Sequence, residues 1–235
     1  NIYFDLGKID KSIELYENAY LNNTGDTILL NNLLGAYLEK RNVEKSKYYL
    51  NEAKKLDTNF INFKLNKAKY LYLANKIDEA INLLKQIISM EDNIASITLL
   101  CKIYFRTNRL SYGNKLLNDK FLTYPNDPKL LRFKGFRNLI EGDFDKGWKL
   151  YEHRHSNLDK RFPTIPEWNG EDLSSKKILV YNEQGIGDAI QFSKYLINLN
   201  KKCKNIDFIS NKSLVEIFDV KEYEGLNLVK EENID

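Results

Sequence analysis

The segment Ile178–Asp188 joins a strand-like run to two glycines and an acidic residue. It reads Ile-Leu-Val-Tyr-Asn-Glu-Gln-Gly-Ile-Gly-Asp and continues as Ala-Ile-Gln-Phe-Ser-Lys-Tyr. The aliphatic run is typical of a buried strand, and Gly185 and Gly187 would let the backbone turn tightly before a helix. A helix start exposes unpaired N–H groups, so this junction can hold a charged ligand or position a catalytic carboxylate at Asp188.

The periodicity around the junction predicts alternating strands and helices. We expect strands over Ile178–Asn182, Ile206–Ser210 and Leu226–Val229, and helices from about Asp188 to Lys202 and over Ser213–Val220. Strands that alternate with helices form parallel sheets, and such sheets bind ligands beyond the carboxyl ends of their strands. Residues 176–235 are therefore predicted to be the incomplete start of a Rossmann-like α/β domain.

The junction residues also admit plainer interpretations. Asp188 is alternatively a helix N-cap, because its spacing to Gln191 is that of a capping box. The two glycines either only make the turn or allow a phosphate to approach the backbone. Glu183 and Gln184 are expected to line a cleft, since charged side chains are rarely buried unpaired.

A nicotinamide dehydrogenase is the obvious alternative for such a junction, and the residues disfavour it. Ile190 stands where the third glycine or alanine of a dinucleotide-binding loop would fall. The second strand leads to Asn211 without the acidic residue that holds a ribose. The segment also lacks the Gly-Lys-Ser or Gly-Lys-Thr of a phosphate-binding loop.

The first two thirds of the chain repeat with a period of about 34 residues. Five segments superpose, each a turn followed by the start of a helix: Gly7–Ser12, Arg41–Ser46, Asn75–Ala80, Asn108–Gly113 and Gly142–Gly147. Their last residues follow one another at intervals of 34, 34, 33 and 34 residues. This period belongs to a pair of antiparallel helices.

The residue types within each segment explain the period. Each segment ends on a small residue, where two helices can touch closely. The third position is always apolar: Ile9, Val43, Ile77, Leu110 and Phe144. These positions define the core-facing stripe of a helix. We predict an α-solenoid over residues 1–158, a linker with Pro163 and Pro166 over residues 159–175, and the α/β start over residues 176–235.

The bulk composition excludes several classes of protein. The 235 residues are 43% hydrophobic and 29% charged with a net charge of +3, so they can bury a core but lack the concentrated basic stripe of a nucleic-acid-binding protein.

Cys101 and Cys203 are far apart in the sequence, which argues against a disulfide framework or zinc site and favours a reducing cytoplasm. No apolar run approaches the roughly 20 residues of a membrane span. His153 and His155 would point to different faces of a helix, so no metal site is expected.

The repeats resemble the tetratricopeptide repeat family, including Pro125 at a repeat boundary. The resemblance covers residues 1–155 and starts with the second helix of a repeat, so we expect the natural array to extend upstream. Such arrays bind proteins or peptides in a concave groove lined by their first helices. Asn32 and Asn66 share the phase at which asparagines in the O-linked N-acetylglucosamine transferases grip peptide backbone, which makes them candidate partner-binding residues. The alternative is that both are ordinary solvated or packing residues.

Further motifs lie in the last repeat, the linker and the strand–helix junction. They comprise Gly147, Trp148, Tyr151, Glu152, Arg154, Trp168, Gly170, Glu171, Leu173, Glu183, Gln184, Gly185, Gly187, Asp188, Gln191, Phe192 and Tyr195. Together they resemble a bacterial family of tetratricopeptide repeat glycosyltransferases related to lipopolysaccharide heptosyltransferases. Trp148 and Trp168 are expected to pack between the solenoid and the catalytic domain.

The resemblance implies a transferase with two Rossmann-like domains across a cleft, of which only the first begins here. In such enzymes the aspartate of the first Gly-Asp turn is the proposed general base for the acceptor hydroxyl, and Asp188 occupies that position. The implied substrate-binding residues are Glu183, Gln184, Gly185, Gly187 and Gln191. The donor, a nucleotide sugar, would bind mainly to the missing second domain, so no cofactor is expected and the fragment alone would be inactive. The alternative is a non-catalytic interaction scaffold, which a gene ending soon after Asp235 would favour.

Overall fold

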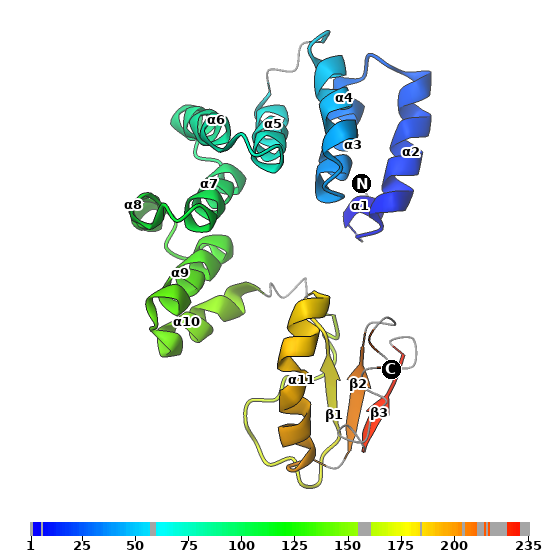
Figure 1. Cartoon of the computed structure of the whole chain (residues 1–235), viewed down its shortest axis with the longest axis vertical. Helices are drawn as coiled ribbons and strands as arrows, with labels where there is room; N and C mark the ends of the chain where they lie inside the picture. The colour runs from blue at the N-terminus through cyan, green and yellow to red at the C-terminus, as the bar shows by residue number, and fades with distance from the viewer. Residues whose placement is uncertain are drawn as a thin grey trace. The chain divides into compact units, whose positions relative to one another are not determined.

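The computed structural model describes residues 2–5, 7–56, 60–154, 161–183, 185–203, 205–210, 214, 216 and 225–230. The chain divides into two compact units, Asn1–Lys160 and Arg161–Asp235, which we call the helical unit and the sheet unit. In Figure 1 the helical unit runs from blue to green and the sheet unit from yellow to red. Each unit is described by itself.

The helical unit consists of antiparallel helix pairs, as the repeats predict. The first helices of the pairs are α3 (Thr27–Glu39), α5 (Ile61–Leu73), α7 (Ile94–Arg106) and α9 (Pro128–Glu141). The second helices are α2 (Ile9–Asn22), α4 (Val43–Ala53), α6 (Ile77–Met90), α8 (Leu110–Thr123) and α10 (Phe144–Tyr151). The short helix α1 (Ile2–Asp5) precedes them, and the 3₁₀ turn η1 (Glu152–Arg154) follows α10. Each second helix begins at the recurrent apolar residue, so the unit resembles a tetratricopeptide repeat solenoid.

The turns between paired helices share one backbone conformation. The first residue of each aligned segment has a positive φ of 56° to 85°: Gly7, Arg41, Asn75, Asn108 and Gly142. In each turn the next residue donates its N–H to the carbonyl five residues earlier, at 2.8–2.9 Å. This is the C-terminal cap in which a left-handed residue ends a helix, a place where glycine is free of strain and asparagine is tolerated. The repeat is therefore present in the backbone as well as in the side chains.

The core of the helical unit lies between facing helices. Its fully buried residues include Leu33, Leu84, Ile103 and Leu117, contributed by first and second helices alike. Neighbouring first helices also contact one another, α3 with α5, α5 with α7, and α7 with α9. In Figure 1, α5 and α7 line the inner side of the curved array, and α6 and α8 lie on its outer side.

The sheet unit contains a three-stranded parallel sheet. Its elements are β1 (Ile178–Tyr181), α11 (Ile186–Asn200), β2 (Ile206–Ile209) and β3 (Leu226–Leu228), and the strand order is β1-β2-β3. Both strand pairs are parallel. The predicted strands and their parallel pairing are confirmed. The predicted helix Ser213–Val220 falls almost wholly outside the described residues.

A small core and one polar network hold this sheet. Leu196 of α11 packs on Phe208, and Leu173 packs with Cys203 and Ile206. Leu173 belongs to the segment that the sequence assigned to a linker, and it is 5% exposed.

The network centres on Asp207 of β2, which is 6% exposed. Its carboxylate accepts a hydrogen bond from Asn227 of β3 at 2.8 Å and pairs with Lys177, just before β1, at 2.6 Å. A buried carboxylate needs such partners, so these contacts favour the pairing that sets Asp207 opposite Asn227.

Candidate functional site

The strand–helix junction places Asp188 within the first turn of α11. The helix begins at Ile186 and its N-cap is Gly185. The interpretation of Asp188 as the N-cap is therefore wrong, because the helix starts three residues earlier than the capping-box spacing suggested. Asp188 is half-buried, and no hydrogen bond or ion pair between described residues holds its carboxylate. As an acidic residue in a first turn it interacts favourably with the helix dipole.

The two junction glycines do not make a left-handed turn. Gly185 has a φ of −69° and a ψ of 168°, and Gly187 is helical without a positive φ. Any residue adopts these conformations, so neither glycine is required by its own φ and ψ. A Cβ at Gly187 would meet nothing within 4 Å, and one at Gly185 would meet only Oδ2 of Asp188, at 3.7 Å. What the glycines provide is a bare backbone at the start of the helix.

The remaining predicted site residues of this unit lie near that helix start. Glu183 is exposed and follows β1 by two residues, and Gln191 is exposed one turn after Asp188. Gln184 lies outside the described residues. Because β1 ends at Tyr181, these residues stand beyond the carboxyl end of a parallel strand, where open α/β sheets bind ligands.

Arg161 also reaches this edge of the sheet, and sequence reasoning missed it. Its guanidinium donates a hydrogen bond to the carbonyl of Asn182 at 3.3 Å. It also lies over the ring of Tyr181, 5.5 Å from the centroid. Arg161 stands 17 residues before β1 in no recognisable motif, so the sequence carried no signal for it. The junction thus combines a carboxylate, bare helix N–H groups and a cation.

The two candidate asparagines of the helical unit have different environments. Asn66 of α5 is 8% exposed, and its amide nitrogen donates to the backbone oxygen of Asn31 at 3.3 Å and to Oδ1 of Asn31 at 3.0 Å. It therefore ties α5 to α3, and a partner would have to displace these bonds. Asn32 of α3 is half-buried. Their role in gripping a peptide stays a prediction.

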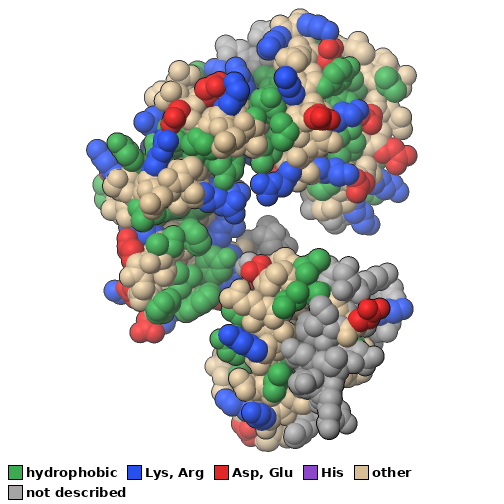
Figure 2. All heavy atoms as spheres, viewed as in Figure 1, with side chains coloured by type: hydrophobic (Ala, Val, Ile, Leu, Met, Phe, Trp, Pro, Cys, Tyr) green, Lys and Arg blue, Asp and Glu red, His purple; other side chains and the backbone are tan. Residues whose placement is uncertain are grey.

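A group of cationic side chains lies on the solvent-facing side of the first helices, which is the inner side of the curved unit. Lys69 of α5, Lys102 and Arg106 of α7, and Arg132 of α9 belong to it, with Arg41 at the turn after α3. We call these five residues the basic face. All but half-buried Lys69 are exposed. Figure 2 shows Lys and Arg side chains gathered on the inner side of the curved helical unit.

Lys102 lies within electrostatic reach of three other cations of the basic face. Desolvation lowers the pKa of Lys102, and repulsion by Arg106, Arg41 and Arg132 lowers it further. Glu39 is the carboxylate that opposes this shift, and it also pairs with Lys69 at 3.7 Å. Cations from three helix pairs, α3/α4, α7/α8 and α9/α10, therefore influence one ammonium group. An anion placed there would relieve their mutual repulsion.

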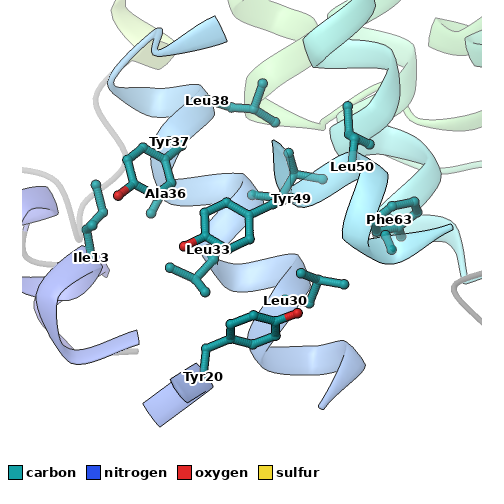
Figure 3. Packing of buried hydrophobic residues seen from close by; sticks show 12 residues of the cluster. Ile13, Tyr20, Leu30, Leu33, Ala36, Tyr37, Leu38, Tyr49, Leu50 and Phe63 are labelled. Atoms are coloured by element: carbon teal, nitrogen blue, oxygen red, sulfur yellow. The ribbon is translucent and has the colours of Figure 1, made fainter. Parts of the chain in front are cut away.

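A polar cluster joins the three helices α2, α3 and α4 and has a structural role. Glu17 of α2 accepts hydrogen bonds from the hydroxyls of Tyr37 at 2.6 Å and Tyr49 at 3.1 Å. The bond from Tyr37 lowers the pKa of Glu17, although desolvation opposes the shift. Figure 3 shows Tyr37 and Tyr49 among the buried leucines between α3 and α4. These contacts connect three helices.

The two tryptophans of the resemblance are both partly open to solvent. Trp148 is 52% exposed and Trp168 is 44% exposed. The indole N–H of Trp168 donates to the carbonyl of Glu171 at 2.9 Å, which folds the segment before Leu173. Their interdomain packing stays a prediction.

Within the described residues, no group of three or more His, Cys, Asp or Glu side chains could hold a metal ion. His155, one of the two histidines considered above, lies outside those residues. No helix in the described part of the chain combines the length and apolarity needed to cross a membrane.

The fold and the junction define a protein with a helical-repeat unit followed by a parallel three-stranded sheet. No protein-family model matches the chain. It is similar to Protein FlbA of Caulobacter vibrioides, with 34% identity over 77 residues that cover 31% of this chain and 13% of FlbA. The chain thus spans a small part of the length of that relative.

One solved structure with a similar arrangement is the crystal structure of MamA. It aligns with a TM-score of 0.47 and 14% sequence identity, over 64% of this chain and 89% of that one.

Proposed function

We propose that the helical unit binds a protein partner and that the sheet unit begins the acceptor-side, Rossmann-like domain of a nucleotide-sugar-dependent glycosyltransferase. The observation that carries the enzymatic part is the position of Asp188. It stands in the first turn of α11, beyond the carboxyl end of β1, beside two glycines at the helix start. The motif resemblance around Asp188 supports the same assignment.

In this proposal Asp188 is the general base. Its carboxylate takes the proton from the acceptor hydroxyl while the acceptor oxygen bonds to the anomeric carbon and the bond to the nucleoside diphosphate breaks. A base must come within hydrogen-bond distance of that hydroxyl. The bare backbone at Gly185 and Gly187 permits such an approach, because neither position carries a Cβ and the space beside Gly187 is open. Gln191, one turn further on, would orient the acceptor.

The test uses the protein encoded by the complete gene and a panel of nucleotide-activated sugars. Replacing the base in Asp188→Ala should lower the rate of sugar transfer by about a hundredfold or more. Asp119→Ala, which removes an exposed aspartate from α8, is the matched control and should keep full activity. Unchanged turnover in Asp188→Ala would refute the base assignment. Absence of transfer by the wild-type protein would leave the non-catalytic scaffold as the function.

The protein-binding part rests on the continuous face of the first helices. Because α3, α5, α7 and α9 contact one another in sequence, their outward side chains form one surface across the repeats. Peptides selected from a random display library should form photo-crosslinks with these helices. Crosslinks confined to the second helices would contradict this role.

A further inference from the structure

The basic face differs from the rest of the chain in its charge. The chain as a whole has nearly equal numbers of cationic and anionic side chains, 36 and 33. The basic face gathers Arg41, Lys69, Lys102, Arg106 and Arg132, with Glu39 as the carboxylate within their reach. Such a concentration of like charge destabilises the isolated surface, since each ammonium or guanidinium repels the others.

The basic face forms a row from the turn after α3 to α9, and the repeat places two of its cations at equivalent positions. Lys69 and Lys102 each lie 11 residues before the small residue of their segment, Ala80 and Gly113 respectively. Neighbouring helices pack about 10 Å apart, so the row from α3 to α9 extends about 30 Å. An extended peptide covers that distance with about nine residues.

We propose that the basic face binds an extended peptide segment rich in Asp and Glu. This inference rests on the proposed protein-binding function of the helical unit and specifies the chemistry of the partner. Carboxylates of the peptide replace the mutual repulsion of the cations with ion pairs, and Arg106 and Arg132 can each hold a carboxylate through two parallel N–H donors. The exposed ring of Phe136, one turn after Arg132, offers an apolar contact beside the charges.

A peptide fits this face better than a nucleic acid does. Glu39 stands within the row and would repel a phosphate backbone, whereas a peptide can place a neutral residue opposite it. Nucleic-acid-binding domains also carry a strong overall positive charge, and the net charge of this chain is +3.

The experiment measures fluorescence anisotropy of labelled peptides of about ten residues, matched to the length of the row. The full 235-residue chain is titrated into an acidic peptide of Asp, Glu, Ser and Gly, its Asn/Gln counterpart and its Lys counterpart. We expect the acidic peptide to bind at least about tenfold more tightly than the Asn/Gln peptide or the Lys peptide. Its binding should weaken when the salt concentration rises from about 0.05 to about 0.5 M.

The double variant Lys102→Glu/Arg106→Glu should weaken acidic-peptide binding at least about tenfold. Lys47→Glu/Lys115→Glu carries the same charge change on exposed positions of the second helices α4 and α8 and should bind like the wild type. Helical circular dichroism of both variants checks that they fold. If folding fails, Lys102→Gln/Arg106→Gln is the substitute, because it removes the charges without adding new ones.

The outcomes separate this inference from the protein-binding function. If the chain binds the neutral or the basic peptide more tightly than the acidic one, the inference of an acidic partner is wrong. The helical unit would still be a protein-binding unit. The inference is also wrong if the control variant weakens acidic-peptide binding as much as Lys102→Glu/Arg106→Glu does, since binding would then follow the net charge alone. Tighter binding of single-stranded oligouridylate than of the acidic peptide would assign the face to a nucleic acid instead.

Discussion

Gly135 and Gly147 of the helical unit and Gly187 of the sheet unit have opposite surroundings. At Gly135 of α9 a Cβ would come within 2.5 Å of the backbone nitrogen of Tyr151, and at Gly147 of α10 one would come within 2.7 Å of Leu139. At Gly187 of α11 a Cβ would meet nothing within 4 Å. In the first unit the missing side chain permits contact between helices, and in the second it leaves space above a helix start.

This difference shows that a glycine in a motif has no fixed meaning. Gly147 and Ala80 occupy the same repeat position, and Ala80 fits a Cβ there with its side chain fully buried. The last pair, α9 and α10, packs backbone against backbone, since a Cβ at Gly135 would come within 2.9 Å of the carbonyl oxygen of Gly147. The surroundings of a glycine decide whether its substitution affects packing or access.

The largest effect should come from Gly135→Ala. Its methyl group would overlap backbone atoms of α10, which cannot move aside as a side chain can, so α9 and α10 must separate. Over-packing of this kind costs about 3 kcal/mol. We expect a lower midpoint of urea unfolding, followed by helical circular dichroism. Gly25→Ala is the matched control, since a Cβ at Gly25 meets nothing within 4 Å and its φ is not positive. Equal midpoints for the two variants would show that the last helix pair is not closely packed.

A smaller loss should follow from Asp207→Ala in the sheet unit. The variant deprives Asn227 and Lys177 of their shared partner, which should cost about 2 kcal/mol. Hydrogen exchange of the amides in β1 and β2 would report it as lost protection. Asp207→Asn is the comparison, because it keeps the acceptor for Asn227 and loses the pair with the half-exposed Lys177, so it should lose less. Unaltered protection in Asp207→Ala would mean that the apolar core alone fixes the register of the sheet.

The sequence predicted the parts of both units that depend on local periodicity. The 34-residue repeat placed the second helices at Ile9 and its counterparts, and the same alignment marked the left-handed turn residues. Strands β1, β2 and β3 were predicted because short, largely apolar runs stand between polar segments. These features depend on neighbours in the chain.

The features that the sequence missed depend on neighbours in space. The start of α11 at Ile186 follows from how the chain leaves β1, so neither the N-cap nor the glycine turn could be decided from spacing. The buried role of Asn66 requires Asn31 on the adjacent helix. The basic face had a signal in the repeated position of Lys69 and Lys102, but the contributions of Arg41 and Arg132 appear only when the helix pairs stack.

A modest, pH-dependent effect is expected from Glu17→Gln in the helical unit. The hydrogen bond from Tyr37 holds the pKa of Glu17 below its ordinary value of 4.5, so its contribution to stability is present above that value and is lost as the pH falls through the folded-state pKa. Because Glu17 is partly exposed, we expect a loss of about 1 kcal/mol at neutral pH. Urea unfolding of the wild type and the variant should converge below about pH 4. A difference that stays constant with pH would assign the loss to shape and not to charge.

Gly187→Ala should have the smallest effect on stability, and it tests directly whether the glycines of the two units differ in role. Alanine suits an exposed helical position better than glycine, so the sheet unit should become more stable by about 0.5 kcal/mol, the opposite of the change at Gly135. If the bare backbone at Gly187 admits the acceptor, sugar transfer by the complete protein should nevertheless fall, because the new methyl group occupies that space. Lys201→Ala, an exposed change at the other end of α11, should leave transfer unaltered. A stability gain with full activity would show that the open space is incidental, and the glycines of the two units would then differ in packing alone.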